Sequence, residues 1–309
     1  MIRQFLLLIR LPNLFTVPTN ILVGYFAIIG STYTNALELL LLILSSLMMY
    51  ISGIVFNDYF DFETDLRERP NRPLPSRKVT KKEALIIALI SLISANILAL
   101  VVSSASLIIS LILSFVVISY DFKLKNTILG PLTMGSARFL NIILGASPTL
   151  FVIILAYNHT NANYLLARII FVSLSLFVYT LAISLLSRKE VVVPRTREHD
   201  GAQTRQIIVI SFLLVFAVIA SIAFAVLLGI LKMELTISLV LFSAILFVTF
   251  KQTNHDDSLT IQNAIKRMVI SIIILDSIFI TGLTGSYYGL LTLIFVLPSM
   301  FLARKLYVT

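Results

Sequence analysis

Long apolar segments separated by short polar ones run through almost the whole chain. A helix rises about 1.5 Å per residue, so about 20 apolar residues are enough to cross the hydrocarbon core of a bilayer. No amphipathic soluble segment of any size lies between the apolar runs, so we expect one all-α, polytopic transmembrane helical bundle over residues 1–309. The pattern predicts ten spans, near residues 8–30, 36–57, 82–103, 105–120, 129–156, 163–186, 206–228, 233–250, 262–284 and 287–303.

The composition supports a membrane protein. Of the 309 residues, 58% are apolar and 13% are charged, whereas a soluble domain has about 25% charged residues. The absence of cysteine excludes thiol catalysis, disulfides and thiolate metal sites. The start of the chain has no small-residue cleavage site, so we expect the first span to be retained.

The net charge of +9 is unevenly distributed and predicts the topology. Lysine and arginine follow the second, fourth, sixth and eighth spans and end the chain, while the alternate loops carry almost none. By the positive-inside rule, the basic loops and both termini are expected on the cytoplasmic side. The basic balance therefore indicates a membrane and not a nucleic-acid partner.

A run of acidic side chains follows directly after the second predicted span. At about 100° per residue, Asn57, Asp61 and Asp65 share one face of a helix, and Asp58 lies beside Asp61. Like charges on one face repel each other, so solubility alone gives no reason to align them. Oxygen ligands of this kind suit Mg²⁺, which proteins hold through a few carboxylates and the phosphates of a substrate. The pattern predicts a magnesium site at the membrane surface.

A stiff, cationic segment follows the acidic run and reads RPNRPLPS over residues 69–76. Its prolines end the helix and prevent it from restarting, and arginine offers forked donors to phosphate oxygens. A basic loop after a span is most often only a topology determinant. Its position directly behind aligned acids favours a site that binds Mg²⁺ and a phosphate-containing substrate.

The segment over residues 57–76, NDYFDFETDLRERPNRPLPS, closely resembles the first aspartate-rich motif of the UbiA superfamily of intramembrane prenyltransferases. The likeness extends in outline over the chain, through Arg10, Pro12 and Asn13 near its start and Tyr120 to Lys125 after the fourth span. It implies a bundle of usually nine spans, so nine to ten here, with a central cavity capped by two cytoplasmic loops. It also implies Mg²⁺-dependent transfer of a prenyl group from a prenyl diphosphate to a lipophilic acceptor: a quinone precursor, an aromatic compound or a glycerol lipid.

The resemblance implies roles for seven residues of this region. Those that would hold Mg²⁺ and the diphosphate are Asn57, Asp61 and Asp65, with Asp58 adjacent, and those that would clamp the diphosphate are Arg67, Arg72 and Lys125. The leaving diphosphate gains charge as its bond to carbon breaks, and cations fixed nearby stabilise that state most. An apolar bundle interior excludes water from the reacting carbon.

The second polar loop, after the sixth span, departs from the pattern of the family. Relatives usually carry a second D-x-x-x-D there, whereas this chain reads LSRKE over residues 186–190. We expect Glu190 to take part in catalysis and Arg188 to bind substrate. The S-R-x-E pattern is similar to a divergent branch that includes EboC-type proteins. The alternative is therefore a non-catalytic or weakly catalytic protein that supports biosynthesis or export of a lipophilic metabolite.

Two ionisable residues lie deep within predicted spans, Arg138 in the fifth and Asp276 in the ninth. Charges at such depth usually pair or face the bundle interior. Two interpretations stay open: a buried structural ion pair, or an acceptor pocket lined by Arg138 and Asn141. A secondary transporter also fits ten spans and deep charges, but it does not explain the acidic run and the segment behind it.

We therefore favour a prenyltransferase in the plasma membrane of a prokaryote. Its expected partners are a prenyl diphosphate, a lipophilic acceptor and the bilayer, with Mg²⁺ as the cofactor. Nothing in the sequence indicates a nucleic-acid partner or an obligate protein partner.

Overall fold

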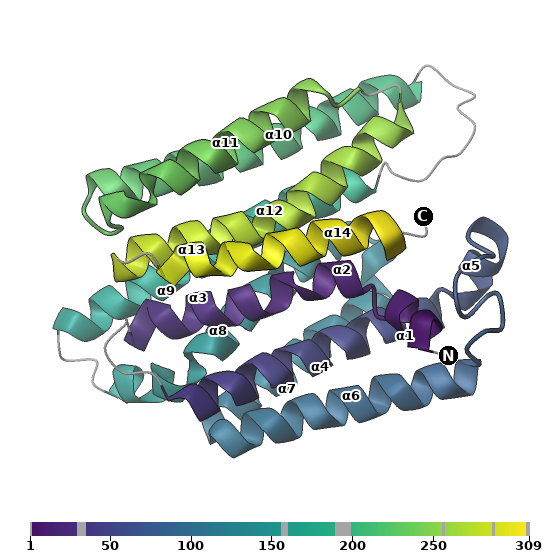
Figure 1. Cartoon of the computed structure of the whole chain (residues 1–309), viewed down its shortest axis with the longest axis horizontal. Coiled ribbons are helices and arrows are strands. Elements are labelled where there is room, and N and C mark those ends of the chain that lie inside the picture. Colours follow the sequence, from purple (N-terminus) through teal and green to yellow (C-terminus); the bar gives the residue numbers. More distant parts are fainter. Residues whose placement is uncertain are drawn as a thin grey trace.

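The computed structural model describes residues 2–29, 35–155, 160–188, 199–254, 257–285 and 288–306. Within these ranges the chain forms helices and no strand, which confirms the predicted all-α class. Long helices lie side by side, and the short helix α5 projects from one end of the bundle (Figure 1).

The helices of the first half are α1 (Ile2–Leu8), α2 (Leu11–Leu14), α3 (Thr16–Ile29), α4 (Ala36–Phe60), α5 (Phe62–Glu68), α6 (Lys81–Val102), α7 (Ser104–Phe122), the 3₁₀ turn η1 (Leu124–Asn126) and α8 (Gly130–Leu155). Those of the second half are α9 (Thr160–Ser187), α10 (His199–Leu227), η2 (Met233–Leu235), α11 (Thr236–Lys251), α12 (Ser258–Thr284), α13 (Tyr288–Thr292), η3 (Leu293–Phe295) and α14 (Val296–Leu306).

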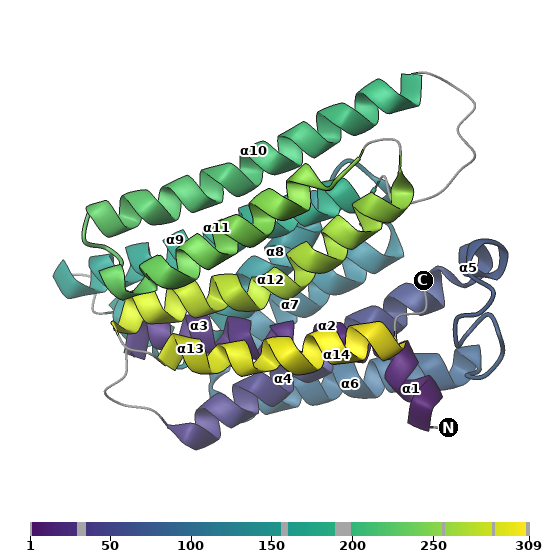
Figure 2. The same ribbon diagram turned by 45° about the horizontal axis from the view of Figure 1, so that its top comes forward.

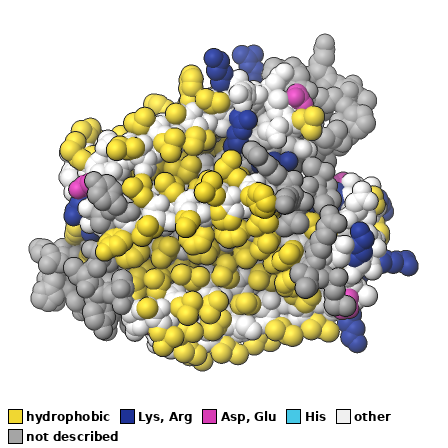
Figure 3. Space-filling model, viewed as in Figure 1, with side chains coloured by type: hydrophobic (Ala, Val, Ile, Leu, Met, Phe, Trp, Pro, Cys, Tyr) yellow, Lys and Arg dark blue, Asp and Glu magenta, His cyan; other side chains and the backbone are white. Residues whose placement is uncertain are grey.

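Eight segments of the described chain are long and apolar enough to cross a membrane. They are α4, α6, α7, α9, α10, α11, α12 and the joined α2–α3 segment Leu11–Ile28. The 26-residue α8 and the shorter α13–α14 segment occupy the other two predicted positions. The exact count of nine to ten spans is not confirmed, but an integral membrane bundle is. Its outer helices expose large apolar side chains such as Ile90 (60%) and Phe224 (60%), and hydrophobic side chains cover most of the face in Figure 3.

Side-chain caps fix where several helices begin. Asn35 accepts hydrogen bonds from the first N–H groups of α4, and Thr80 and Glu83 form a reciprocal capping box at the start of α6. Ser103 ends α6 and caps α7, so two spans predicted from one long apolar stretch are separated by a single extended residue. These polar residues divide the apolar sequence into helices of spanning length.

The core of the second half is α12, which is buried continuously from Ser271 to Leu283. A helix that is apolar on all sides belongs at the centre of a bundle, and α12 packs against α3, α9, α11 and α13. Close contact between α3 and α8 depends on glycine. A β-carbon at Gly24 would lie 1.9 Å from the Ile142 carbonyl oxygen, and one at Gly145 would lie 2.3 Å from that of Ile21.

The polar first loop lies at one end of the bundle together with α1 and the last residues of α14 (Figures 1 and 2). This position brings the N-terminal segment next to the acidic run, although 48 residues separate Arg10 from Asp58. The second polar loop begins after α9, and most of it lies outside the described residues. The predicted central cavity stays a prediction.

Candidate active site

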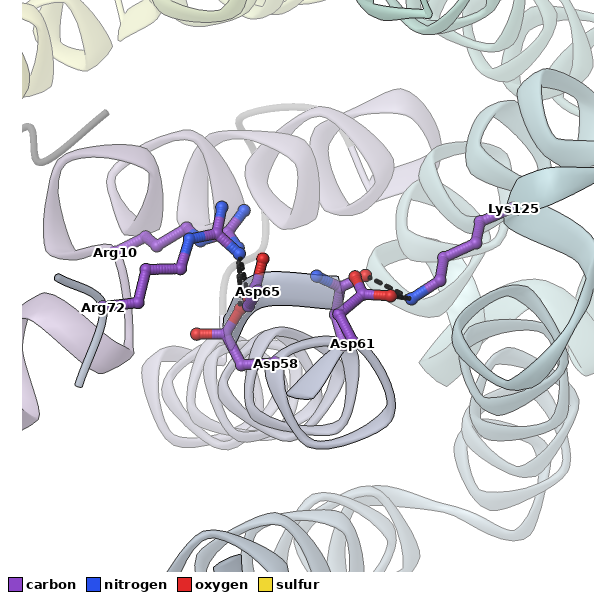
Figure 4. Close-up of polar contacts among 7 residues, drawn as sticks. Arg10, Asp58, Asp61, Asp65, Arg72 and Lys125 are labelled. Carbon is purple, nitrogen blue, oxygen red and sulfur yellow. Dashed lines mark hydrogen bonds and ion pairs between the residues drawn. The ribbon is translucent and has the colours of Figure 1, made fainter. Parts of the chain in front are cut away.

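The acidic run lies where α4 ends and α5 begins. Asp61 has φ −83° and ψ 2°, so it interrupts the helix that the sequence predicts through residue 65. The α-helical hydrogen bonds nevertheless continue across the junction, from the Asp61 N–H to Asn57 and from the Asp65 N–H to Asp61. Asp58 and Asp65 point to one side, toward two arginines, and Asp61 points to the other, toward a lysine (Figure 4).

Asp58 and Asp65 share the guanidinium groups of Arg10 and Arg72. The Asp58 Oδ1 accepts from Arg10 Nη2 at 2.8 Å and lies 3.5 Å from Arg72 Nη1, which also donates to Asp65 Oδ2 at 2.7 Å. Both carboxylates are buried, at 4% and 3% exposure. The proline-rich segment thus folds back over the acids as its order predicts, and Arg72 is the arginine that it delivers.

Asp61 and Asn57 share a different cation, Lys125. Its Nζ lies 2.5 Å from Asp61 Oδ1 and donates to Asn57 Oδ1 at 3.2 Å. Lys125 comes from η1, directly after α7, so a second loop reaches the same end of the bundle. The Asp61 side chain is 27% exposed, against 6% for Asp58 and 4% for Asp65, so it is the most accessible of the three acids.

Burial dominates the electrostatics of the arginine side. Burial raises the pKa of the Asp65 carboxyl, outweighing the opposite effect of Arg72, and the neighbouring Asp58 and Asp61 raise it further. Burial and the nearby Arg10 lower the pKa of the Arg72 guanidinium. The two guanidinium groups face two buried carboxylates, so the charges on this side balance.

The sequence profile of the UbiA prenyltransferase family matches residues 17–273. The chain belongs to the UbiA prenyltransferase family. A digeranylgeranylglyceryl phosphate synthase of Methanosphaera stadtmanae is 37% identical over 117 residues, 35% of this chain and 41% of that relative. The match thus spans less than half of the relative's length.

Solved structures share the fold. A UbiA homolog from Aeropyrum pernix K1 superimposes with a TM-score of 0.68 at 13% identity, covering 87% of this chain and 97% of that one. A UbiA homolog from Archaeoglobus fulgidus bound to DMAPP and Mg²⁺ has a TM-score of 0.50 at 12% identity, covering 98% of this chain and 97% of that one. The UbiA resemblance predicted from residues 57–76 is therefore confirmed.

Arg10 is the site residue whose role sequence reasoning missed. It was one of three residues that support the family resemblance, and no spacing rule connects it with Asp58. It adopts the left-handed region (φ 46°, ψ 55°) before α2, where a residue with a β-carbon costs roughly 1 kcal/mol or more. A left-handed backbone is uncommon for residues other than glycine, so it marks Arg10 as a candidate functional residue. Only a structure reveals it.

Other residues predicted for this UbiA-family site lie further from the acids. Arg67 is exposed on α5 and forms no ion pair within the described chain. Arg188 is exposed after α9, and its Nη2 donates to the Thr127 carbonyl oxygen, next to the η1 turn that carries Lys125. Glu190 lies outside the described residues. The roles predicted for these three residues stay predictions.

Arg138 and Asp276 approach each other in the interior but do not touch. Arg138 Nη1 donates to Asn20 Oδ1 at 2.6 Å, and Asn20 Nδ2 donates to Asp276 Oδ2 at 2.7 Å. A direct ion pair was one of the two interpretations from the sequence. The structure instead connects the two residues by hydrogen bonds through the Asn20 amide, which can both accept and donate. Asn141 is occupied separately, since its Oδ1 accepts from Ser46 Oγ.

Tyr120 and Asp121 lie at the end of α7, close to the site. Asp121, Asp61, Arg10 and Arg188 are charged neighbours of the Tyr120 side chain. Asp121 lies in the last turn of α7, which continues to Phe122 and has Lys123 as its C-cap. Asp121 is only 3% exposed, and its Oδ2 has no hydrogen-bond partner.

Proposed function

We propose that this chain is an intramembrane prenyltransferase that moves a prenyl group from a prenyl diphosphate to a lipophilic acceptor with Mg²⁺ as cofactor. The observation that carries the proposal is the pairing, at one end of an apolar bundle, of three aspartates with Arg10, Arg72 and Lys125. Acids that can hold a metal and cations that can hold a diphosphate thus occupy the same place. A transporter of the same fold would need neither.

The donor set fits Mg²⁺. Asn57 and the three aspartates offer only oxygen atoms, which this hard cation prefers. Within the described ranges, no three acidic or histidine side chains converge closely enough to hold a metal alone. This agrees with the way Mg²⁺ completes its shell with substrate phosphates and water. Asn57, Asp61 and Asp65 would hold the ion, with Asp58 adjacent, and the bound ion would neutralise charge on the diphosphate.

The chain's own residues would act on the leaving group. As the allylic C–O bond breaks, the diphosphate departs with the electron pair, and Arg10, Arg72 and Lys125 stabilise its growing charge. The acceptor then supplies the electron pair for the new bond to carbon and releases a proton. The apolar helices around the reaction keep water away from the reacting carbon. Arg67, Arg188 and Glu190 stay proposed members of the site.

For the acceptor we propose a glycerol-based lipid that carries a phosphate. The support is that several relatives 30–42% identical over part of the chain are named digeranylgeranylglyceryl phosphate synthase. Arg138 and Asn141 are proposed to line the place where the acceptor head group lies. They would line it while keeping their hydrogen bonds to Asn20 and Ser46.

We also propose that the site faces the cytoplasm of a prokaryotic cell. The basic loops around residues 67–82 and 123–125 share this end of the bundle, as the positive-inside rule requires.

Purified protein with labelled prenyl diphosphates of several lengths tests the proposal. The mixture contains geranylgeranylglyceryl phosphate, an aromatic quinone precursor or no acceptor. We expect a prenylated glycerol lipid that forms with Mg²⁺ and not with EDTA, and an Asp61→Asn variant at least about 100-fold slower. A folded protein that forms no product with any acceptor would favour the supporting role in metabolite biosynthesis or export.

A further inference from the structure

Asp121 is a buried acid for which the proposed reaction provides no role. It lies in the last turn of α7, is 3% exposed and leaves its Oδ2 without a hydrogen-bond partner. Burying a carboxylate costs free energy unless a cation or hydrogen bonds compensate it. The capping of α7 does not explain Asp121, because the C-cap residue is Lys123, whose N–H bonds to the Ser119 carbonyl. The residue therefore has unused capacity to bind a cation.

Lys125 is a cation near Asp121. The other charged neighbours of this carboxyl are Asp61, Arg10 and Asp58. Lys125 lies four residues further along the chain, just past the end of α7. Its ammonium group contacts Asp61 and Asn57 but makes no hydrogen bond to Asp121. Lys125 thus has two acidic neighbours, Asp61 and Asp121, and forms an ion pair with Asp61.

The residues that Lys125 contacts are the ones proposed to hold Mg²⁺. An ammonium group and a divalent ion repel each other strongly at such distances. Lys125 must therefore leave Asp61 and Asn57 when the ion binds, yet its charge is still needed beside the diphosphate. The carboxylate of Asp121, four residues before Lys125 in the chain, would keep the charge of the lysine near the site.

We propose that Asp121 is a positioning residue for Lys125. It takes over the ammonium group when Mg²⁺ and diphosphate occupy Asp61 and Asn57, so that Lys125 stays beside the leaving group. This inference rests on the proposed function. Without Asp121, Lys125 has only Asp61 and Asn57 as partners and competes directly with the metal. Removing the lysine removes that competition, whatever residue stands at position 121.

Direct metal binding distinguishes this role from a structural one. Mn²⁺, which gives an electron paramagnetic resonance signal when free in solution, is titrated into the purified full-length protein with and without inorganic diphosphate. The proteins are the wild type, Asp121→Asn, Lys125→Gln and the double variant. We expect Asp121→Asn to weaken Mn²⁺ binding about tenfold. In the Lys125→Gln background the same change should have less than about a twofold effect.

Glu63→Gln is the matched control, because Glu63 is an exposed acid on α5, at the same end of the bundle, without an assigned role, and it should leave binding unchanged. Asp121→Ser replaces Asp121→Asn if the latter does not fold as a monodisperse protein. Wild-type binding in the Asp121 variant, or an equal loss in both backgrounds, overturns the inference and leaves the proposed function intact. A wild-type protein that binds no Mn²⁺ even with diphosphate overturns both.

Discussion

The molecule holds charged side chains in two regions, and it holds them differently. At the end of the bundle, Arg10, Arg72 and Lys125 contact carboxylates directly, and Asp61 is still 27% exposed. In the interior, Arg138 and Asp276 are joined through Asn20 and, in parallel, through Thr16 and Thr19, and Asn20, Thr16, Thr19 and Asp276 are all completely buried. The pairs of Asp61 and Arg10, which solvent reaches, can exchange partners at small cost. A network of buried groups cannot.

The difference follows from the surrounding medium. At the end of the bundle, solvent reaches Asp61 (27% exposed) and Arg10 (37% exposed), although Asp58 and Asp65 are buried, so a metal and a diphosphate can displace the partners of those exposed groups. In the interior the effective dielectric constant is low, and a polar group that loses its partner keeps the full cost of burial. We infer that the end region is built to bind and release and that the interior network fixes α3, α8 and α12 to one another.

The interior network should show the largest effect of a single substitution. Arg138→Met leaves Asp276 without its compensating charge, so we expect a loss of about 3–5 kcal/mol in the free energy of unfolding. Asn20→Leu should cause a similar loss, because it separates the two charges. Asn96→Leu is the matched control, since Asn96 is an amide on α6 that bonds only to Leu92 and Ser114, and it should cost about 1 kcal/mol. Unfolding in a denaturing detergent measures all three.

A double-mutant cycle then tests whether the network acts as a unit. Arg138→Met combined with Asp276→Leu removes both charges, so it should cost less than the sum of the single changes. Additive losses would contradict the bridged network and favour a direct role for Arg138 in binding the acceptor.

The end region should respond most clearly in substrate binding, although Arg72→Gln should also lower stability because Asp65 is buried. Arg72→Gln removes the group that joins Asp58 to Asp65, and we expect the KM for prenyl diphosphate to rise about 10- to 100-fold. Lys78→Gln is the matched control, because Lys78 is an exposed cation of the same loop without an ion pair in the described chain, so its KM should stay within about twofold. Steady-state kinetics with labelled prenyl diphosphate measure both. Equal effects would mean that the loop acts through its overall charge and not through the contacts of Arg72.

The sequence predicted the fold well, because the length of apolar runs reports directly on spanning helices. It also predicted which end carries the site, because Asn57, Asp58, Asp61 and Asp65 lie together in the chain. It did not predict that the acids divide onto two sides, because that depends on the break at Asp61. Arg10 and the bridging Asn20 were missed for one reason: their partners, Asp58 and Asp276, are 48 and 256 residues away, and no local pattern records such contacts.

Accessibility to a reagent should separate the two regions with the least disturbance to the protein. The chain has no cysteine, so a single introduced thiol gives the whole labelling signal. Glu63 is exposed on α5, Glu234 is exposed in the turn between α10 and α11, and Ser46 is 2% exposed within the bundle. In Figure 1 the α10–α11 turn and α5 lie at opposite ends of the molecule.

A membrane-impermeant maleimide that is added to intact cells should label Glu234→Cys only. The same reagent added to inverted membranes should label Glu63→Cys only. Ser46→Cys should stay unlabelled from both sides until the protein is denatured, because the side chain at this position is buried between helices. Labelling of Glu63→Cys from outside the cell would reverse the proposed orientation. Labelling of Ser46→Cys from the side of α5 would show that water enters the interior, and the contrast between an exchangeable end and a fixed interior would then fail.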